Sequence, residues 1–445
     1  MRVISVVLGA ALSSCAAPFA APSPDFVELV LHVPPGQAQV VTTIRFTAAE
    51  IASNVHREPG HLYTWLERLE RQVDLDPAPE TILLRSPRGQ PGDTVRVVVD
   101  TTGAGLDGLF GAPGVAETLV ELPPGPGRIE RRLSFPAPSG RKPCDGPRLV
   151  SLEVTAPELA AGTDSGLHRV CIQLPTSYDT SPERRYPVVF VFPGFSGHAS
   201  QNDGFGARAI VDRLGVETGV EVLLVGVETR VAEGTRYLSG ARRGGDWVGY
   251  VTKRLTAELD QRFRTMPRRA AFGHSTGGWN ALSLAIEAPD FLDAVGASSP
   301  DPLDLDVWLF EGDTVRPRWT WWQRAEERLG GRGQFRSWAT SWSPQGRMLF
   351  DERGALRPDV YEAWKTESPM RRPGPATRRL SGRVFLTAGT KDMFDLYAPT
   401  LRFVEHLRAK GSEVAWKPTE LDHFGATEER FTPLIRFLLE RLRAN

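Results

Sequence analysis

The feature that most constrains the fold of this chain is a short stretch in which a strand pattern changes into a helix pattern at one serine. The apolar run Arg268–Phe272 predicts a buried strand, and Trp279–Glu287 predicts a helix. Between them, Gly273–Gly278 has the sequence Gly-His-Ser-Thr-Gly-Gly. A nucleophile elbow has this order of strand, Gly-x-Ser-x-Gly and helix, and its sharp turn requires glycine at both ends. The stretch therefore predicts an α/β sheet that presents Ser275 as a nucleophile.

The second half of the chain agrees with such a sheet. From Arg148 onward, short strand patterns alternate with helical patterns, which is typical of a largely parallel sheet. The run Tyr186–Phe192 is apolar throughout, as expected of a central strand that is buried on both faces. We therefore expect residues 146–445 to form one mostly parallel α/β domain.

A serine nucleophile needs a histidine that removes its proton and a carboxylate that orients the histidine. In this architecture the acid and then the histidine follow the serine along the chain. Only His406 and His423 follow Ser275. His406 lies within a predicted helix, whereas His423 lies in a predicted loop before the last helix, where a base is expected. His423 is therefore the predicted base.

The acid is expected at the end of the strand that precedes this loop. Arg383–Thr387 predicts that strand, and Asp392 follows its end in the segment Gly389–Asp392. Asp392 is the predicted acid, and Asp395 and Asp422 are the alternatives that the sequence leaves open.

Acyl transfer also needs two N–H donors that point at the oxyanion of the intermediate. The backbone N–H of Thr276, directly after the nucleophile, is the first candidate. The second is expected in the loop after the strand 186–192, where the turn Gly194–Gly197 contains Phe195. This chemistry needs no cofactor, and no ligand spacing in the chain indicates a metal site.

The first 24 residues indicate export. Arg2 precedes an apolar run, Val3–Leu12, that has the length of a signal peptide and is too short to span a bilayer. The segment Leu12–Cys15 is similar to a bacterial lipobox, in which the cysteine is lipidated and becomes the mature N-terminus. Two interpretations stay open: a lipoprotein attached to the membrane through Cys15, and plain cleavage that yields a secreted or periplasmic protein.

Residues 25–145 predict a smaller, mainly-β, sandwich-like domain. Strand patterns occur at Phe26–Val33, Gln39–Phe46 and Thr94–Asp100, and one helix is expected at His61–Glu70. This region has no constellation of side chains to which we assign chemistry.

Cys144 and Cys171 form an even pair near the boundary between the two domains. In an exported protein such a pair predicts a disulfide. It would close a loop of about 27 residues and stabilise the fold by roughly 3 kcal/mol.

Residues 300–382 form a long insert for their position in the domain. Tryptophan rings there either pack the core of a small helical cap or, for two or three of them, line the mouth of the site and stack on sugars or aryl groups. The insert contains seven of the 11 tryptophans: Trp308, Trp319, Trp321, Trp322, Trp338, Trp342 and Trp364.

Taken together, several segments of residues 148–445 resemble an esterase family of the α/β-hydrolase superfamily. This family includes feruloyl esterases, siderophore esterases, S-formylglutathione hydrolases and mycolyltransferases. One position differs from many relatives, because Pro193 precedes Gly194 where they have histidine. The matching segments occur in the family's order and are Arg185–Val189, Asp246–Thr252, Arg262–Thr265, the Gly-His-Ser-Thr-Gly-Gly elbow, Gly389–Asp392 and His423-Phe424.

The resemblance implies an α/β-hydrolase fold with Ser275, Asp392 and His423 as a catalytic triad. It also implies an ester substrate of small-molecule, carbohydrate or siderophore type. The sequence therefore predicts an exported serine carboxylic-ester hydrolase that forms an acyl-enzyme. Acyl transfer on the same fold and a binding protein with a hydrolase-like fold are the alternatives. A net charge of -1 gives no sign of a nucleic-acid partner.

Overall fold

The computed structural model describes the backbone of eight strands before residue 140 and most of the chain after it. The described ranges after residue 140 are 144, 146–157, 159, 167–195, 197–200, 206–231, 234–239, 245–317, 319–320, 322–323, 334–372, 379–392, 394–423 and 427–443. Cys15, the helix expected at 61–70 and Trp321 lie outside the described residues. The chain divides into two compact units, residues 1–140 with 317–333 and residues 141–316 with 334–445.

The strands before residue 140 belong to the first unit. One sheet has the order β1-β6-β7, a second has the order β5-β2-β8, and β3 pairs with β4. The strand patterns predicted near residues 26, 41 and 94 correspond to β2, β3 and β6. A sandwich-like arrangement and a signal peptide at the start of the chain stay predictions. The strands are β1 (Arg2–Val7), β2 (Phe26–His32), β3 (Val41–Thr43), β4 (Arg71–Val73), β5 (Thr81–Pro87), β6 (Thr94–Asp100), β7 (Val115–Glu121) and β8 (Gly127–Arg132).

The second unit is built on an eight-stranded sheet with the order β20-β19-β16-β15-β11-β12-β10-β9. The strands from β20 to β12 are parallel to their neighbours, and β10 runs antiparallel to both β12 and β9. The predicted mostly parallel sheet is therefore confirmed. Its strands are β9 (Leu149–Thr155), β10 (Leu167–Gln173), β11 (Tyr186–Phe192), β12 (Leu223–Val227), β15 (Thr265–His274), β16 (Ala294–Ser298), β19 (Val384–Thr387) and β20 (Val414–Trp416).

The two central strands β11 and β15 show why the sequence forms this sheet. All seven residues of β11 are buried, because helices cover both faces. Pro187 has no N–H to donate to a ladder, and the pairing of β11 with β15 shifts register at this position, between Tyr186 and Val188. Further along, Phe192 pairs with Gly273, so β11 and β15 end side by side.

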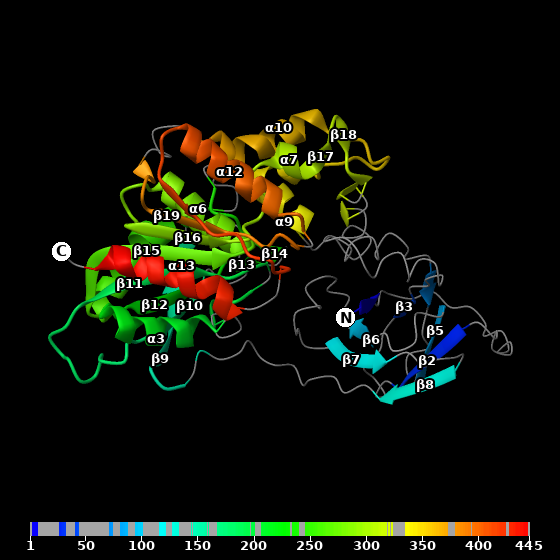
Figure 1. Cartoon of the computed structure of the whole chain (residues 1–445), viewed down its shortest axis with the longest axis horizontal. Coiled ribbons are helices and arrows are strands. Elements are labelled where there is room, and N and C mark those ends of the chain that lie inside the picture. The colour runs from blue at the N-terminus through cyan, green and yellow to red at the C-terminus, as the bar shows by residue number, and fades with distance from the viewer. Residues whose placement is uncertain are drawn as a thin grey trace. The chain divides into compact units, whose positions relative to one another are not determined.

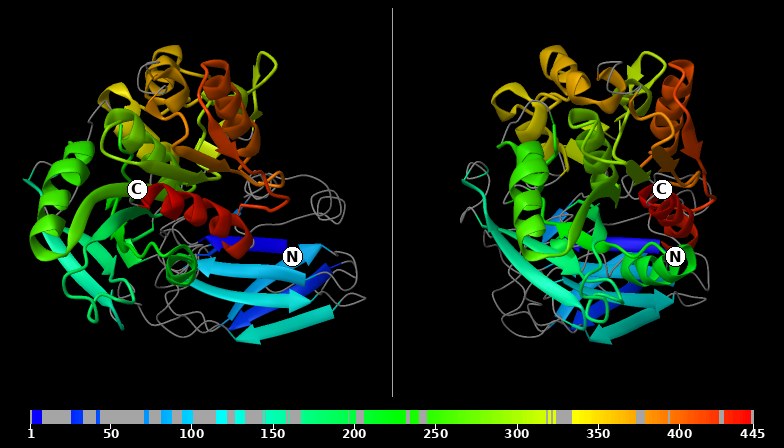
Figure 2. Two further views of the ribbon diagram at one scale, coloured as in Figure 1. Left: turned by 60° about the vertical axis from the view of Figure 1, so that its left-hand side comes forward. Right: turned by 90° about the vertical axis from the view of Figure 1, so that its left-hand side faces the viewer.

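Helices cover both faces of the sheet (Figure 1). α3 (Ala207–Thr218) and α13 (Thr427–Leu442) lie on one face, and α6 (Thr276–Glu287) and α12 (Tyr397–Ala409) lie on the other (Figures 1 and 2). Leu434, Leu438 and Leu439 of α13 pack with Ile210 and Leu214 of α3 over the sheet, in a core of fully buried side chains. This burial of the helices' apolar faces is the main stabilising contribution to the layered fold.

Several shorter strands and helices connect the elements named above. Asp246 caps the segment before β15 by accepting a hydrogen bond from Gly249 N at 2.9 Å. Among the described helices, none is both long and apolar enough to cross a membrane. The remaining elements are β13 (Arg230–Val231), β14 (Gly234–Thr235), α4 (Trp247–Gly249), η5 (Tyr250–Leu255), α5 (Thr256–Arg262), α7 (Leu305–Leu309), β17 (Phe310–Glu311), β18 (Thr314–Val315), α9 (Gln334–Trp342), η6 (Pro344–Gly346), α10 (Pro358–Glu367) and η7 (Pro369–Arg371).

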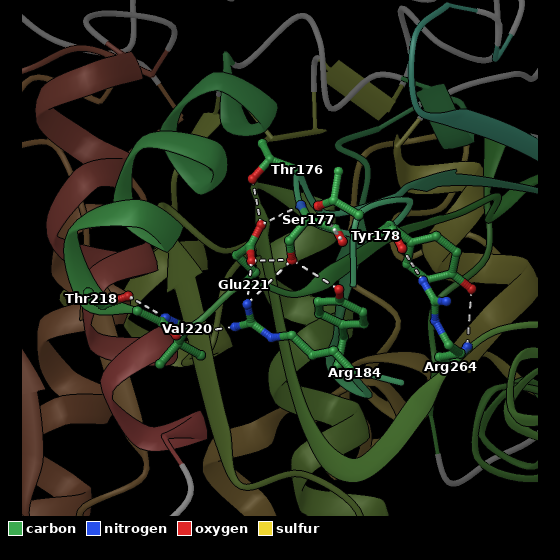
Figure 3. Close-up of polar contacts among 11 residues, drawn as sticks. Thr176, Ser177, Tyr178, Arg184, Thr218, Val220, Glu221 and Arg264 are labelled. Carbon is green, nitrogen blue, oxygen red and sulfur yellow. Dashed lines mark hydrogen bonds and ion pairs between the residues drawn. The ribbon is translucent and has the colours of Figure 1, made fainter. Parts of the chain in front are cut away.

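A polar network joins the loops at the amino ends of the parallel strands (Figure 3). Glu221 lies just before β12 and accepts hydrogen bonds from Ser177 N at 2.9 Å, Ser177 Oγ at 2.5 Å and Thr176 Oγ1 at 2.5 Å. Arg184, just before β11, donates to the same carboxylate at 2.7 Å. Arg264, just before β15, donates to the carbonyl oxygen of Tyr178. The network therefore ties three strand starts to the loop after β10.

The predicted disulfide between Cys144 and Cys171 is present. It joins the segment before β9 to the middle of β10, and the two Cα atoms lie 5.5 Å apart. This separation is within the usual range for a disulfide.

Candidate active site

The predicted elbow forms a tight turn between β15 and α6. Ser275 has φ 57° and ψ −128°, a conformation that residues other than glycine rarely adopt. A β-carbon at Gly277 would lie 2.0 Å from the carbonyl oxygen of Phe192, and one at Gly273 would lie 2.2 Å from the carbonyl carbon of Gly277. The two glycines are therefore required because backbone passes directly beside them.

The loop after β11 lies beside this turn. A β-carbon at Gly194 would lie 3.9 Å from the β-carbon of Ser275. Gly197 N donates to Gly194 O at 2.9 Å, which closes a turn with Phe195 inside it. Thr276 is the first residue of α6, and the first N–H groups of a helix have no partner within the helix. Of the two predicted oxyanion donors, Phe195 thus lies in the turn beside Ser275, and Thr276 lies at the start of α6.

The predicted base and acid are in direct contact. His423 Nδ1 lies 2.8 Å from Asp392 Oδ2, and both side chains are at most 3% exposed. The second oxygen of this carboxylate, Oδ1, accepts a hydrogen bond from Phe394 N at 3.0 Å. Both carboxylate oxygens are therefore engaged, and the imidazole is fixed through its Nδ1 atom.

The two loops that carry these residues extend the pairing of β19 with β20. Thr390 N donates to Thr419 O at 2.8 Å, and Lys391 N donates to Leu421 O at 3.2 Å. A β-carbon at Gly389 would lie 2.0 Å from Leu421 O, so this position also requires glycine. Continued backbone pairing beyond the strand ends thus brings Asp392 to His423.

The alternative acids and the alternative histidine have other surroundings. Asp395 forms an ion pair with Arg316 at 2.9 Å. Asp422 is exposed, and its backbone carbonyl accepts a hydrogen bond from Arg430. His406 lies on α12, as predicted. The acid that contacts His423 through a hydrogen bond in the structure is Asp392.

Aromatic rings on two sides restrict the His423 imidazole. The His274 ring centroid lies 4.5 Å from that of His423, and the Phe394 ring meets it edge-on at 4.6 Å. His274 also lies 3.1 Å from Ser298 Oγ through its Nδ1 atom. Burial, together with the nearby His423 and Arg430, holds the pKa of His274 well below its ordinary value. His274 is therefore a neutral packing partner of His423 at neutral pH.

A second carboxylate at this site, Asp301, was not predicted from the sequence. Ser275 Oγ donates a hydrogen bond to Asp301 Oδ1 at 3.3 Å, and Asp301 is only 4% exposed. Burial raises the pKa of Asp301, although hydrogen bonds from Tyr237 and Thr276 favour its ionised form. One signal was available in the sequence: Asp301 follows the end of a parallel strand, where the polar groups of such sheets meet.

The described tryptophans of the insert are packed rather than exposed. All six are at most 4% exposed. The Trp338 ring stacks on Trp342 with centroids 5.7 Å apart, and both contact the ring of Trp364. Trp308 Nε1 donates to Phe394 O at 2.9 Å. The structure agrees with the interpretation in which these rings pack a core, and it adds that Trp308 holds the segment after Asp392.

Comparisons with known proteins show what this chain is similar to. Residues 166–412 match the family model described as "Esterase: Putative esterase". A search of curated protein sequences found no match. The solved structure of an S-formylglutathione hydrolase from Agrobacterium tumefaciens is 16% identical, with a TM-score of 0.41, and the match covers 67% of this chain and 98% of that one.

Two further solved structures are similar at the same level. MPT51 from Mycobacterium tuberculosis is 14% identical, with a TM-score of 0.46, over 67% of this chain and 100% of that one. A ferulic acid esterase from Anaeromyces mucronatus is 15% identical, with a TM-score of 0.43, over 67% of this chain and 93% of that one. Because the family model matches more than half of the 445 residues, this chain belongs to the esterase family that the model describes.

Proposed function

We propose that this chain is a serine carboxylic-ester hydrolase in which Ser275, His423 and Asp392 form the catalytic triad. The observation that carries the proposal is the buried 2.8 Å contact between His423 Nδ1 and Asp392. The His423 ring also packs against His274, the residue that precedes Ser275, so the predicted base lies next to the elbow. Membership of the esterase family and the strained turn at Ser275 support the same assignment.

In the proposed reaction, the Ser275 hydroxyl attacks the ester carbonyl carbon while His423 takes its proton. Since Nδ1 of the imidazole is engaged by Asp392, Nε2 is the nitrogen that takes the proton. Asp392 keeps the ring in this orientation and stabilises the imidazolium. The imidazolium then donates the proton to the departing alkoxide, which leaves as an alcohol, and the acyl group stays on Ser275.

Water completes the cycle. His423 removes a proton from a water molecule, which attacks the acyl-enzyme, and the same proton returns to Ser275 as the carboxylic acid leaves. In both steps the negative carbonyl oxygen is stabilised by the backbone N–H groups of Phe195 and Thr276. The closeness of Gly194 to Ser275 and the position of Thr276 at the start of α6 support this part of the proposal.

The proposal predicts that Ser275 is the residue that reacts with a fluorophosphonate probe. The wild-type protein should be labelled at Ser275 and should hydrolyse p-nitrophenyl acetate, whereas Ser275→Ala should do neither and should still show a cooperative thermal unfolding transition. Ser181→Ala changes a serine at the opposite end of the sheet and should match the wild type. Wild-type turnover in Ser275→Ala would falsify the assignment.

For the natural substrate we propose only a class, namely small-molecule, carbohydrate or siderophore-type esters. A panel of short-acyl, feruloyl, sugar-acetyl and siderophore trilactone esters would rank them by kcat/KM. Equal, low values across the panel would argue for a substrate outside this class.

We also propose that the protein is exported and attached to the bacterial envelope through lipidated Cys15. The apolar run at residues 3–12 and the lipobox-like segment ending at Cys15 support this. Radiolabelled palmitate should be incorporated when the full chain is expressed in a bacterial host, and Cys15→Ala should abolish incorporation. A full chain that stays unlabelled in the cytoplasm would count against export.

A further inference from the structure

In addition to the carboxylate of the proposed triad, a second carboxylate lies next to the proposed nucleophile. Ser275 Oγ donates to Asp301 Oδ1 at 3.3 Å. The backbone N–H of Asp301 also donates to the carbonyl oxygen of Ser275, again at 3.3 Å. Asp301 thus holds both the side chain and the backbone of the residue that carries the reacting oxygen.

The other oxygen of this carboxylate organises the start of helix α6. Asp301 Oδ2 accepts hydrogen bonds from Tyr237 OH at 2.5 Å, Thr276 Oγ1 at 2.8 Å and Gln334 Nε2 at 2.6 Å. Tyr237 OH also lies within hydrogen-bond distance of Thr276 Oγ1, at 3.2 Å. The side chain of Thr276 is therefore fixed from two directions, which fixes the direction of the backbone N–H that the proposed mechanism aims at the oxyanion.

This arrangement is costly in free energy. Asp301, Tyr237, Thr276 and Gln334 are all at most 6% exposed. Within the part of the chain that the structure describes, the side-chain donors to Asp301 are uncharged: Tyr237, Thr276, Gln334 and Ser275. A buried carboxylate whose hydrogen-bond donors are all uncharged lowers stability, so a contribution to folding does not explain why Asp301 is there. A polar group of this kind beside a nucleophile is typical of a residue retained for function.

We propose that Asp301 is a fourth catalytic residue, which holds Ser275 Oγ in place through Oδ1 in the resting site, before the hydroxyl turns its single hydrogen toward His423 Nε2, and which fixes the Thr276 oxyanion donor through Oδ2. Gln334, the first residue of α9, acts through Asp301 as a positioning residue, so the Trp-rich insert contributes directly to the catalytic geometry. This inference rests on the proposed hydrolase function, because Ser275 and Thr276 have these roles only there.

Three variants separate orientation from bulk structure. Asp301→Ala removes the acceptor for all four donors, and kcat for p-nitrophenyl acetate should fall about 100-fold with KM within about threefold, the size of effect seen when an oxyanion donor is lost. Asp301→Asn keeps one oxygen for the three donors and an amide beside Ser275, and kcat should return to within about tenfold of wild type. Gln334→Met keeps the volume, removes one donor, and should lower kcat by about threefold to tenfold.

The rate of fluorophosphonate labelling at Ser275 provides a second readout and should fall in the same order. Asp306→Asn is the matched control, because Asp306 lies on the same segment but bonds Tyr361 and Arg371. If Asp301→Ala does not fold, Gln334→Met decides: kcat lower by about threefold to tenfold with KM unchanged supports the role of Asp301, and wild-type kcat overturns it.

The possible outcomes are distinct. Variants that match the wild type in kcat and in labelling rate would overturn the role of Asp301 alone. A change confined to KM, or no recovery in a folded Asp301→Asn protein, would also overturn it. A wild-type protein that neither hydrolyses the ester nor is labelled at Ser275 would overturn the proposed function, and this inference with it.

Discussion

The two ends of the central sheet each hold a carboxylate that collects several side-chain hydrogen bonds, yet the two carboxylates differ in cost. At the amino ends of the strands, Glu221 is bonded by Ser177, Thr176 and Arg184 (Figure 3). At the carboxyl ends, Asp301 is bonded by three uncharged donors and by the proposed nucleophile. Burial raises the pKa of Glu221, but its hydrogen bonds and Arg184 outweigh this and lower it overall. For Asp301, burial prevails and raises the pKa.

The difference shows that polar groups at the amino end of the sheet stabilise the fold, whereas several features at the carboxyl end destabilise it. The amino end joins loops through a charge with a cationic partner, which stabilises the fold. The carboxyl end combines a buried carboxylate with uncharged donors, a positive φ at Ser275 and glycines in tight contact with backbone. Binding and catalytic sites of parallel sheets lie at this end, so the costs coincide with the proposed chemistry.

The largest effect is expected from filling the tight contact at the carboxyl end. Gly277→Ala would place a β-carbon 2.0 Å from Phe192 O, which only a backbone shift relieves, so we expect a loss of about 3 kcal/mol or more in unfolding free energy. Denaturant unfolding followed by circular dichroism measures this. Gly194→Ala is the control, because its β-carbon meets no atom closer than 3.7 Å. Equal stability of the two variants would contradict the required close approach.

The residues that the sequence predicted are those whose positions follow from chain order. Ser275 directly follows β15, Asp392 follows β19 and His423 follows β20, in the order that this architecture demands. Each was predictable because a parallel sheet brings the ends of its strands to one edge. The disulfide was predictable for a different reason, since only two cysteines were left to pair.

Asp301 and its donors were not predictable in the same way. Tyr237 lies 64 residues from Asp301, and Gln334 lies 33 residues away in the insert. Their convergence depends on the path of loops and of the insert, for which periodicity gives no signal. The same holds for the roles of the tryptophans, because ring packing depends on tertiary contacts that no spacing in the insert specifies.

The second expected effect comes from a buried cation behind the proposed base. Arg430 of α13 is 2% exposed, and it donates to Ser299 Oγ at 3.0 Å and to the carbonyl oxygen of Asp422. Arg430→Met keeps the bulk but frees the His423 loop, so unfolding free energy should fall by about 2–3 kcal/mol and ester hydrolysis by about tenfold. Arg436→Met, on the exposed side of the same helix, should change stability by less than about 0.5 kcal/mol. Similar losses in both variants would argue against a positioning role for Arg430.

The third prediction tests the amino end directly. Glu221→Gln removes the charge from the network and should lower unfolding free energy by about 1–3 kcal/mol at pH 7. Because the pKa of Glu221 is lowered in the folded state, this stabilisation is present above the ordinary value near 4.5 and is lost as pH falls through the folded-state pKa. The difference between wild type and Glu221→Gln should therefore shrink on acidification, as measured by unfolding at pH 7 and pH 3. A difference that is independent of pH would mean that the Glu221 charge contributes nothing.

The smallest effect, and the one of opposite sign, is expected from the corresponding change at the carboxyl end. Because the pKa of Asp301 is raised in the folded state, the stability that its protonated form provides is present below its ordinary value of 3.8 and is lost as pH rises through the folded-state pKa. Asp301→Asn resembles the protonated acid at every pH. We therefore expect equal stability of the variant and the wild type near pH 4, and a variant more stable by about 1 kcal/mol at pH 8, because a buried charge is removed.

Urea unfolding at both pH values measures this, with Asp290→Asn, at an exposed carboxylate, as the control. A variant less stable than the wild type at pH 8 would mean that Asp301 stabilises the fold as Glu221 does, and the contrast between the two ends would fail. The expected sign instead means that the ionised Asp301 lowers the free energy of unfolding. A residue that lowers stability and yet is needed for full kcat, as proposed for Asp301→Ala, shows the trade-off between stability and activity.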